Sequence, residues 1–306
     1  MTRLDLTRHL NKRPDAWSVM IVSGHLALVL LPLYLCAWSG LGLQLILAWL
    51  WVGVGMNGLL NLMHECAHYH VFRERAGSQF LGRWILGPLA LADFDAYQKR
   101  HWIHHRQLGE AEDPKYIYRR NIRGQRCAAF ALRCLGLVEA LKKFTGQTLR
   151  SPSVGGTPSP PSRIWILRTV VVQGLLGGSL LLMATLPSSR SLGEGLWAGA
   201  AAYGGGYLYG LASLTVWVAS MRAIAEHQIT DDGATNQKDA ALRNFQSGRF
   251  LGWLLGSYGF VQHATHHFEP AIPYYNLPAA TTALAAANPA FAPRHTYGRV
   301  LGTVIG

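Results

Sequence analysis

The chain has 306 residues, of which 50% are hydrophobic and only 14% are charged, and it contains ten Trp and 33 Gly. Soluble globular domains carry about 25% charged residues, so this composition argues against a soluble protein and favours an integral membrane protein. The formal net charge is +12, and the excess of Lys and Arg that causes it lies outside the apolar segments.

Four apolar segments are long enough to cross a bilayer, because about 20 apolar residues span its hydrocarbon core as a helix. They are residues 17–38, 41–63, 164–187 and 194–220, and the glycines of the last predict close helix packing. The N-terminus is polar for too long to be a cleavable signal peptide. We therefore expect an all-α fold of one domain, residues 1–306, with four transmembrane helices and a helical cap made of 64–162 and 221–306.

The basic residues predict the orientation of these spans. Residues 64–162 alone hold fifteen Lys and Arg, whereas the short links at 39–40 and 188–192 hold only Arg190. Because Lys and Arg concentrate on the cytoplasmic side, both termini and the cap are expected in the cytoplasm, with the chain in a bacterial inner membrane. The basic surface suits anionic lipid headgroups, or an acidic redox partner or carrier protein. No aromatic and basic module indicates nucleic-acid binding.

The cysteines and one stretch rich in Ser, Pro and Gly carry little chemistry. The four cysteines, Cys36, Cys66, Cys127 and Cys134, form no C-x-x-C pair, so disulfides, iron–sulfur clusters and zinc ribbons are not expected. Residues 151–162, SPSVGGTPSPPS, are typical of a flexible lead into the third span.

Histidines are concentrated in three short boxes, which hold eight of the thirteen. The boxes are HECAH with His64 and His68, HWIHH with His101, His104 and His105, and HATHH with His263, His266 and His267. The i, i+3 and i+4 spacings bring the imidazoles of a box to one face of a helix. His227, in RAIAEHQ, is a ninth candidate, since it follows the fourth span as His64 follows the second.

The other histidines are not expected to bind a metal. His70 lies two residues past His68, on a different helix face, and His9, His25 and His295 have no partner in the sequence. Three residues that lead into the second box, Asp93, Asp95 and Tyr97, are candidates for shaping the entrance of the site.

The number of boxed histidines bears on the metal. A catalytic zinc ion uses three protein ligands, so eight or nine imidazoles favour two metal ions with four or five ligands each. Imidazole suits Fe, Cu, Zn or Ni, and the residue types do not choose among them. A zinc peptidase is the alternative, in which His64 and His68 bind zinc and Glu65 is the general base. A metal transporter is less consistent, because the boxes lie outside the spans.

The boxes also resemble those of a known family. HECAH, HWIHHRQLGEAEDP, the EH at 226–227 and HATHHFEPAIPYYNLP look like the histidine boxes of the integral-membrane fatty acid desaturases, bacterial type, over residues 50–280. The resemblance implies two Fe²⁺ ions, dioxygen as co-substrate, and nine ligands: His64, His68, His101, His104, His105, His227, His263, His266 and His267. Glu65, Asp113 and Glu226 lie beside these histidines in the sequence and are candidates for orienting imidazole N–H groups, with a helix-surface or loop-capping role as the alternative.

Three departures from the family pattern qualify the resemblance. The first box is H-x-x-x-H, one residue shorter than in acyl-CoA desaturases, which disfavours acyl-CoA as the direct substrate. Ala223 stands where some members have an Asn that holds a water, so either one iron lacks that ligand or another group supplies it. Glu269 replaces a usual apolar residue after the third box and is expected to be solvated.

The resemblance implies a desaturase that introduces a C=C bond into a lipid acyl chain or a small lipophilic metabolite. A hydroxylase or ketolase of the same family is the alternative, because the boxes are the same. The sequence has no G-x-G-x-x-G motif, heme segment or ferredoxin cysteine spacing. An external electron donor, such as a ferredoxin with its reductase, is therefore expected on the basic face, with membrane lipid as the other partner.

Overall fold

The structure of the protein is a computed structural model, which describes residues 6–108, 110, 112–114, 162–227, 242–246 and 249–305. The flexible lead expected at 151–162, apart from Ser162, and the cysteines Cys127 and Cys134 lie outside these residues. The described part is helical and has no strand, only an isolated bridge between Phe245 and His295. This confirms the predicted all-α fold.

Within the described residues, four helical segments are long and apolar enough to cross a membrane. They are α1 (Asp15–Ser39), α2 (Leu43–Ala67), α8 (Arg163–Thr185) and a continuous fourth segment, Leu192–His227. The fourth comprises α9 (Leu192–Ala201), the π-helical segments η4 (Ala202–Leu208) and η5 (Leu211–Thr215), and α10 (Val216–His227).

The helices of the second and fourth spans continue past the predicted span ends, and both extensions carry histidines. The second was expected to end at residue 63 and continues to Ala67, through most of the first histidine box. The fourth was expected to end at residue 220 and continues to His227. The same helices that cross the bilayer therefore hold His64 and His227 rigidly at their ends.

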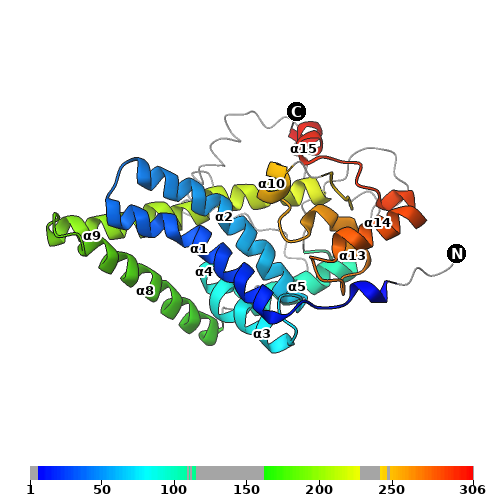
Figure 1. Cartoon of the computed structure of the whole chain (residues 1–306), viewed down its shortest axis with the longest axis horizontal. Helices are drawn as coiled ribbons and strands as arrows, with labels where there is room; N and C mark the ends of the chain where they lie inside the picture. Colours follow the sequence, from blue (N-terminus) through cyan, green and yellow to red (C-terminus); the bar gives the residue numbers. More distant parts are fainter. Residues whose placement is uncertain are drawn as a thin grey trace.

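Several of the remaining helices gather at one end of the molecule. In Figure 1 the turns that join α1 to α2 and α8 to α9 lie at the left, whereas α5 (Phe94–Gln107), α13 (His263–Phe268) and α14 (Leu277–Ala287) lie at the right. The shorter elements are η1 (Thr7–His9), α3 (Arg75–Leu81), η2 (Gly82–Leu86), α4 (Gly87–Leu89), α12 (Arg249–Leu254), η6 (Phe260–Gln262), η7 (Pro289–Phe291) and α15 (Tyr297–Ile305). This end is the cap that the sequence predicts.

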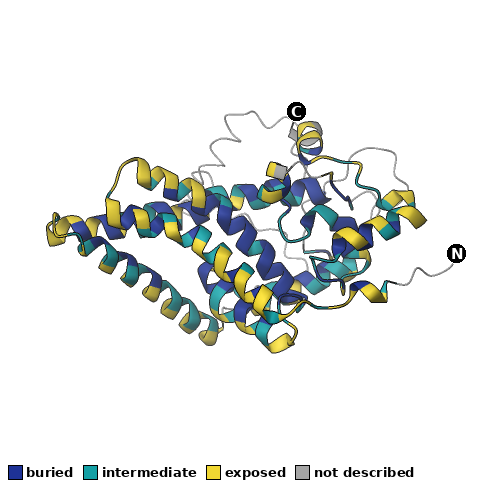
Figure 2. Ribbon diagram, in the orientation of Figure 1, coloured by how far each residue is buried: buried dark blue, intermediate teal, exposed yellow. Residues whose placement is uncertain are grey.

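The surface of the long helices is apolar where it is exposed. Leu175 is 70% exposed, Trp197 67% and Val170 64%, and Figure 2 shows such exposed faces along the spans. In water a continuous apolar surface of this kind would drive association, whereas in a bilayer lipid tails cover it. The burial pattern therefore agrees with a membrane location.

The starts of three helices are set by side-chain caps. The hydroxyl of Ser162 accepts from Trp165 N at the start of α8, and Ser191 and Glu194 form a capping box at the start of α9. The carboxylate of Asp93 accepts from the first backbone N–H groups of α5. These caps satisfy N–H groups that a helix leaves unbonded in its first turn.

Two buried asparagines tie the second span to the segment that leads to the third histidine box. Asn57 Nδ2 donates to Leu254 O at 2.8 Å, and Asn61 Nδ2 donates to Leu255 O at 3.3 Å and to Ser257 Oγ at 2.9 Å. A side-chain amide that is buried inside a span is costly unless its N–H groups are hydrogen-bonded. These hydrogen bonds therefore fix the segment before the third box against α2.

Close packing of α8 against α9 depends on Gly199, as the glycine-rich sequence predicts. A Cβ at Gly199 would lie 2.8 Å from Leu181 Cα and 3.1 Å from Leu180 O, which are backbone atoms that cannot rotate away. We expect Gly199→Ala to lower the free energy of unfolding by about 1–3 kcal/mol through overpacking. Thermal unfolding in detergent measures this, with Gly193→Ala as the control, since nothing lies within 4 Å of that position. Equal melting temperatures for the Gly199 variant and the wild type would contradict the close approach.

Candidate metal centre

Five histidines from three helices converge on the first of two neighbouring groups. Helix α2 and its C-cap provide His64 and His68, α5 provides His101 and His105, and α13 provides His266. One ring nitrogen of each lies within 4.8 Å of those of the other four. Four of these side chains are buried and that of His105 is half-buried.

The ring nitrogens of this first group are too close for a set of ordinary hydrogen bonds. Successive Nε2 to Nε2 distances are 2.6 Å from His68 to His101, 3.0 Å from His101 to His105, and 3.2 Å from His105 to His266. A neutral Nε2 carries either one hydrogen or one lone pair, so one hydrogen would have to serve two of these contacts. A cation that accepts a lone pair from each nitrogen removes this conflict, and the donor set therefore fits a metal ion.

The second group adjoins the first and uses the remaining four histidines. Ring nitrogens of His104, His227 and His267 lie within 4.8 Å of one another, and His263 Nε2 is 3.0 Å from His227 Nε2. The buried Nε2 of His267 has no hydrogen-bond partner in the described residues. The rings of His105 and His267 are 4.3 Å apart, so the two groups are contiguous. Nine predicted ligands are thus brought together as two adjacent sets.

Burial keeps His267, in the second group, in the form that binds metals. Desolvation of the buried ring, followed by the neighbouring histidines, lowers the pKa of His267 well below its ordinary value. The imidazole is therefore neutral at pH 7. Since a metal ion binds the neutral ring, this environment favours the binding of a metal cation.

Two of the three predicted carboxylates lie behind imidazole rings. Glu65 Oε1 accepts from His64 Nδ1 at 2.8 Å, and both carboxylate oxygens of Asp113 lie 2.9 Å from His104 Nδ1. An Nδ1–H that is held by a carboxylate leaves the lone pair on Nε2, which faces the group. Glu65 is the sequence neighbour of His64, whereas Asp113 follows His104 by nine residues and is brought to it by the fold.

Glu226 lies differently from the other two carboxylates. Its Oε2 is 3.9 Å from His263 Nε2, on the side of the ligand atoms, and 3.6 Å from Arg222 Nε. The carboxylate also lies within 4.8 Å of the ligand nitrogen of His227. Ala223, one turn earlier in α10, has no side-chain polar atom. Glu226 is therefore a candidate for the substitute ligand that the departure at Ala223 leaves open.

The prediction that His70 lies on a different helix face from His68 is wrong, although His70 does stand outside both groups. Helix α2 ends at Ala67, and Tyr69 has a left-handed φ of 61°, so His70 lies on no helix face. The turn brings His70 Nδ1 to 3.2 Å from Glu65 Oε2. Spacing alone missed this contact, because nothing in the sequence marks Tyr69 as left-handed.

The structure gives the other singled-out residues supporting positions. Asp93 caps α5, Asp95 pairs with Arg83 at 2.7 Å on the surface, and the ring of Tyr97 stacks on His101 at 5.6 Å. Burial raises the pKa of Tyr97, so its phenol stays protonated. Glu269 is half-buried at the end of α13, outside both groups.

The three isolated histidines also lie outside the groups, as expected. His25 bonds to Tyr258 Oη at 2.7 Å and to Gly55 O at 3.0 Å between the spans. The carbonyl oxygen of His9 accepts from Asn276 at 2.8 Å, and that of His295 accepts from Gln246 N at 2.6 Å. All of these contacts are structural in character.

The geometry disfavours the zinc-peptidase alternative. A general base at Glu65 would need a free carboxylate oxygen beside a metal-bound water. Both oxygens instead face Nδ1 atoms, those of His64 and His70. The alternative also leaves the second group without a purpose.

The fold and the site together define an integral membrane protein with a buried, histidine-rich candidate centre for two metal ions. Residues 37–299 match the model of the fatty acid desaturase family, and the chain belongs to that family. Its function is therefore of the desaturase and hydroxylase type, and the enzyme is an oxidoreductase. None of the curated proteins compared with the chain shows significant similarity to it.

Proposed function

We propose that the protein is an O2-dependent diiron desaturase that introduces a C=C bond into an aliphatic chain. The observation that carries the proposal is the convergence of nine imidazoles from α2, α5, α10 and α13 on two contiguous groups. Two six-coordinate irons that leave positions open for substrates can use four or five ligands each, whereas structural zinc sites are four-coordinate. Iron bound in such a centre would activate dioxygen, which would then oxidise an unactivated C–H bond.

The residues divide into three roles in this proposal. His64, His68, His101, His105 and His266 hold one metal, and His104, His227, His263 and His267 hold the other, with Glu226 as the additional ligand of the second. Glu65 and Asp113 fix the rings of His64 and His104 through Nδ1. The ring of Phe260 lies 4.6 Å from that of His64 and 5.8 Å from that of His263, so it closes both groups to water on that side.

The reaction consumes electrons that the chain must receive from outside. Removing two hydrogens from adjacent carbons with one O2, two electrons and two protons gives an alkene and two waters. The alternative outcome, hydroxylation, gives an alcohol and one water from the same inputs. A ferredoxin with its reductase, docked on the cytoplasmic face of a bacterial inner membrane, is the proposed donor.

Product analysis tests the proposed function. Iron-loaded protein in vesicles with NADPH, ferredoxin and its reductase should convert saturated acyl chains to alkenes, seen by mass spectrometry, and NADPH alone should give no product. His266→Ala should abolish conversion under the same conditions. An alcohol in place of the alkene would establish the hydroxylase instead. Full activity with NADPH alone would contradict the external donor.

A further inference from the structure

His70 is buried beside the candidate centre, although it belongs to neither histidine group. Its ring stacks on that of His68, with 5.4 Å between the ring centroids. Its Nδ1–H donates to Glu65 Oε2 at 3.2 Å, whereas Glu65 Oε1 accepts from His64 Nδ1 at 2.8 Å. One carboxylate therefore joins His70 to a histidine of the first group.

The burial of Glu65 makes both of these hydrogen bonds matter. Its side chain is only 1% exposed, so water does not replace a hydrogen bond that is lost. The backbone N–H of Tyr274 is a further donor to the carboxylate. Removing the N–H of His70 would leave a buried charge with one hydrogen bond fewer, which is costly, and would free the carboxylate to rotate toward other donors. His70 thus helps to keep Oε1 on His64.

A tight turn after α2 brings His70 back to this carboxylate. Tyr69 has a φ of 61°, a left-handed conformation that residues other than glycine seldom adopt. Two backbone hydrogen bonds close the turn, from Tyr69 N to Cys66 O at 3.0 Å and from His70 N to Glu65 O at 2.9 Å. A conformation of this kind persists where the surrounding contacts impose it.

The N-terminal segment supplies such contacts. The ammonium group of Lys12 donates to three carbonyl oxygens of the turn, those of Tyr69 at 2.6 Å, Phe72 at 3.1 Å and Arg73 at 3.0 Å. The carboxylate of Asp15 accepts from Arg73 N at 2.8 Å, at the start of α1, which lies at the cap end of the molecule (Figure 1). The turn that carries His70 is therefore held from outside the two histidine groups.

We propose that His70 is a positioning residue for the first metal group, which acts through Glu65 on His64. By holding the carboxylate, it fixes the orientation of the His64 ring and so the direction in which His64 Nε2 presents its lone pair to a metal ion. His70 is not itself a ligand. The inference rests on the two-metal centre of the proposed function, but it does not depend on which product that centre forms.

The affinity of the metal-free protein for Fe²⁺, titrated anaerobically in detergent, tests this without turnover. His70→Leu removes the N–H donor and should lower the affinity about tenfold, the lower end of the range for groups that orient metal-binding histidines. His70→Asn has nearly the shape of Leu but places an amide N–H near the position of Nδ1, so it should recover most of the loss. His9→Leu, at a buried histidine outside both groups, is the control and should leave the affinity unchanged.

A double-mutant cycle with Glu65→Ala separates positioning from packing. If His70 acts through Glu65, His70→Leu should change the Fe²⁺ affinity less than about twofold in the Glu65→Ala background. A tenfold loss in both backgrounds would overturn the inference, because it would show that His70 acts through its packing. An affinity of His70→Asn no better than that of His70→Leu would overturn it too.

The outcomes also separate this inference from the proposed function. The melting temperature of each metal-free variant is measured first, and His70→Phe, which keeps a ring against His68, replaces His70→Leu if that variant fails to fold. Wild-type Fe²⁺ affinity in the variant without the N–H donor would overturn the inference even if the wild type forms alkenes. Affinities that follow the prediction in a protein that oxidises no aliphatic chain would overturn the proposed function and leave the role of His70 standing.

Discussion

Replacing His101 with Ala is expected to remove the metal of the first group and to lower the rate of product formation by about a thousandfold or more, the effect of losing roughly 4 kcal/mol of transition-state stabilisation. His101 is central to that group, because its Nε2 lies 2.6 Å from that of His68 and 3.0 Å from that of His105. The bound metal should fall to one ion per chain or below. Elemental analysis of the purified variant measures this directly.

The matched control for this variant is His295→Ala, which removes a histidine that lies outside both groups. It should keep the full metal content and the wild-type rate. A His101 variant that retains all of its metal would contradict the assignment of the first group. Loss of metal in both variants would instead indicate a general effect on folding.

Replacing Asp113 with Asn is expected to weaken metal binding by about 10–100-fold without removing any ligand. Both oxygens of Asp113 lie 2.9 Å from His104 Nδ1, and the carboxylate is fully buried. The Asn side chain keeps the shape of Asp but loses its negative charge, which makes His104 a stronger metal ligand. Titration of the apoprotein with Fe²⁺ under anaerobic conditions measures the change in affinity.

Asp95→Asn is the control for charge loss near the same helix. Asp95 is half-exposed and pairs with Arg83, so its neutralisation should leave the Fe²⁺ affinity unchanged. Equal affinities for the Asp113 variant and the wild type would show that His104 is held by the packing around it and not by the carboxylate.

The sequence indicated which histidines lie close together better than how they divide between the two groups. Each box was expected to converge as one unit, since i, i+3 and i+4 positions share a helix face. In the structure HWIHH is divided: His101 and His105 join the first group and His104 joins the second. Adjacent residues differ by about 100° around a helix, so His104 and His105 face different histidine groups, and only the packing of α5 between its neighbours decides which.

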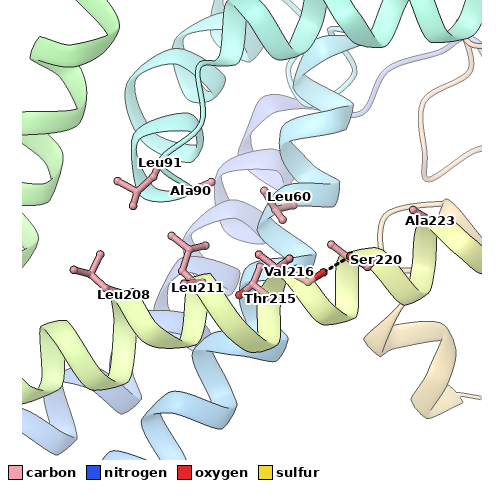
Figure 3. A pocket seen from close by; sticks show the side chains of 11 residues that line it. Leu60, Ala90, Leu91, Leu208, Leu211, Thr215, Val216, Ser220 and Ala223 are labelled. Atoms are coloured by element: carbon pink, nitrogen blue, oxygen red, sulfur yellow. Dashed lines mark hydrogen bonds between the residues drawn. The ribbon is translucent and has the colours of Figure 1, made fainter. Parts of the chain in front are cut away.

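The spans were predictable because their length and apolar composition follow from the bilayer. Hydropathy alone does not locate the helix ends, but the positions of His64 and His227 after the second and fourth spans favour helices that continue out of the membrane. The two π-helical segments of the fourth span have no signal in its glycine-rich sequence. The structure also has an apolar cavity of about 470 Å³ (Figure 3). The residues that line this cavity could not be predicted, since they belong to α2, the end of α4 and the fourth span, which only the fold brings together.

The most direct test of the diiron centre is the metal content of wild-type protein, purified in detergent and analysed for Fe, Zn, Cu and Ni together, with Mössbauer spectra of ⁵⁷Fe-loaded samples. The two contiguous histidine groups predict about two irons per chain, coupled to each other in the spectra. A single zinc per chain, retained in His267→Ala and lost in His64→Ala, would contradict the diiron centre and return the first histidine box to a mononuclear zinc site.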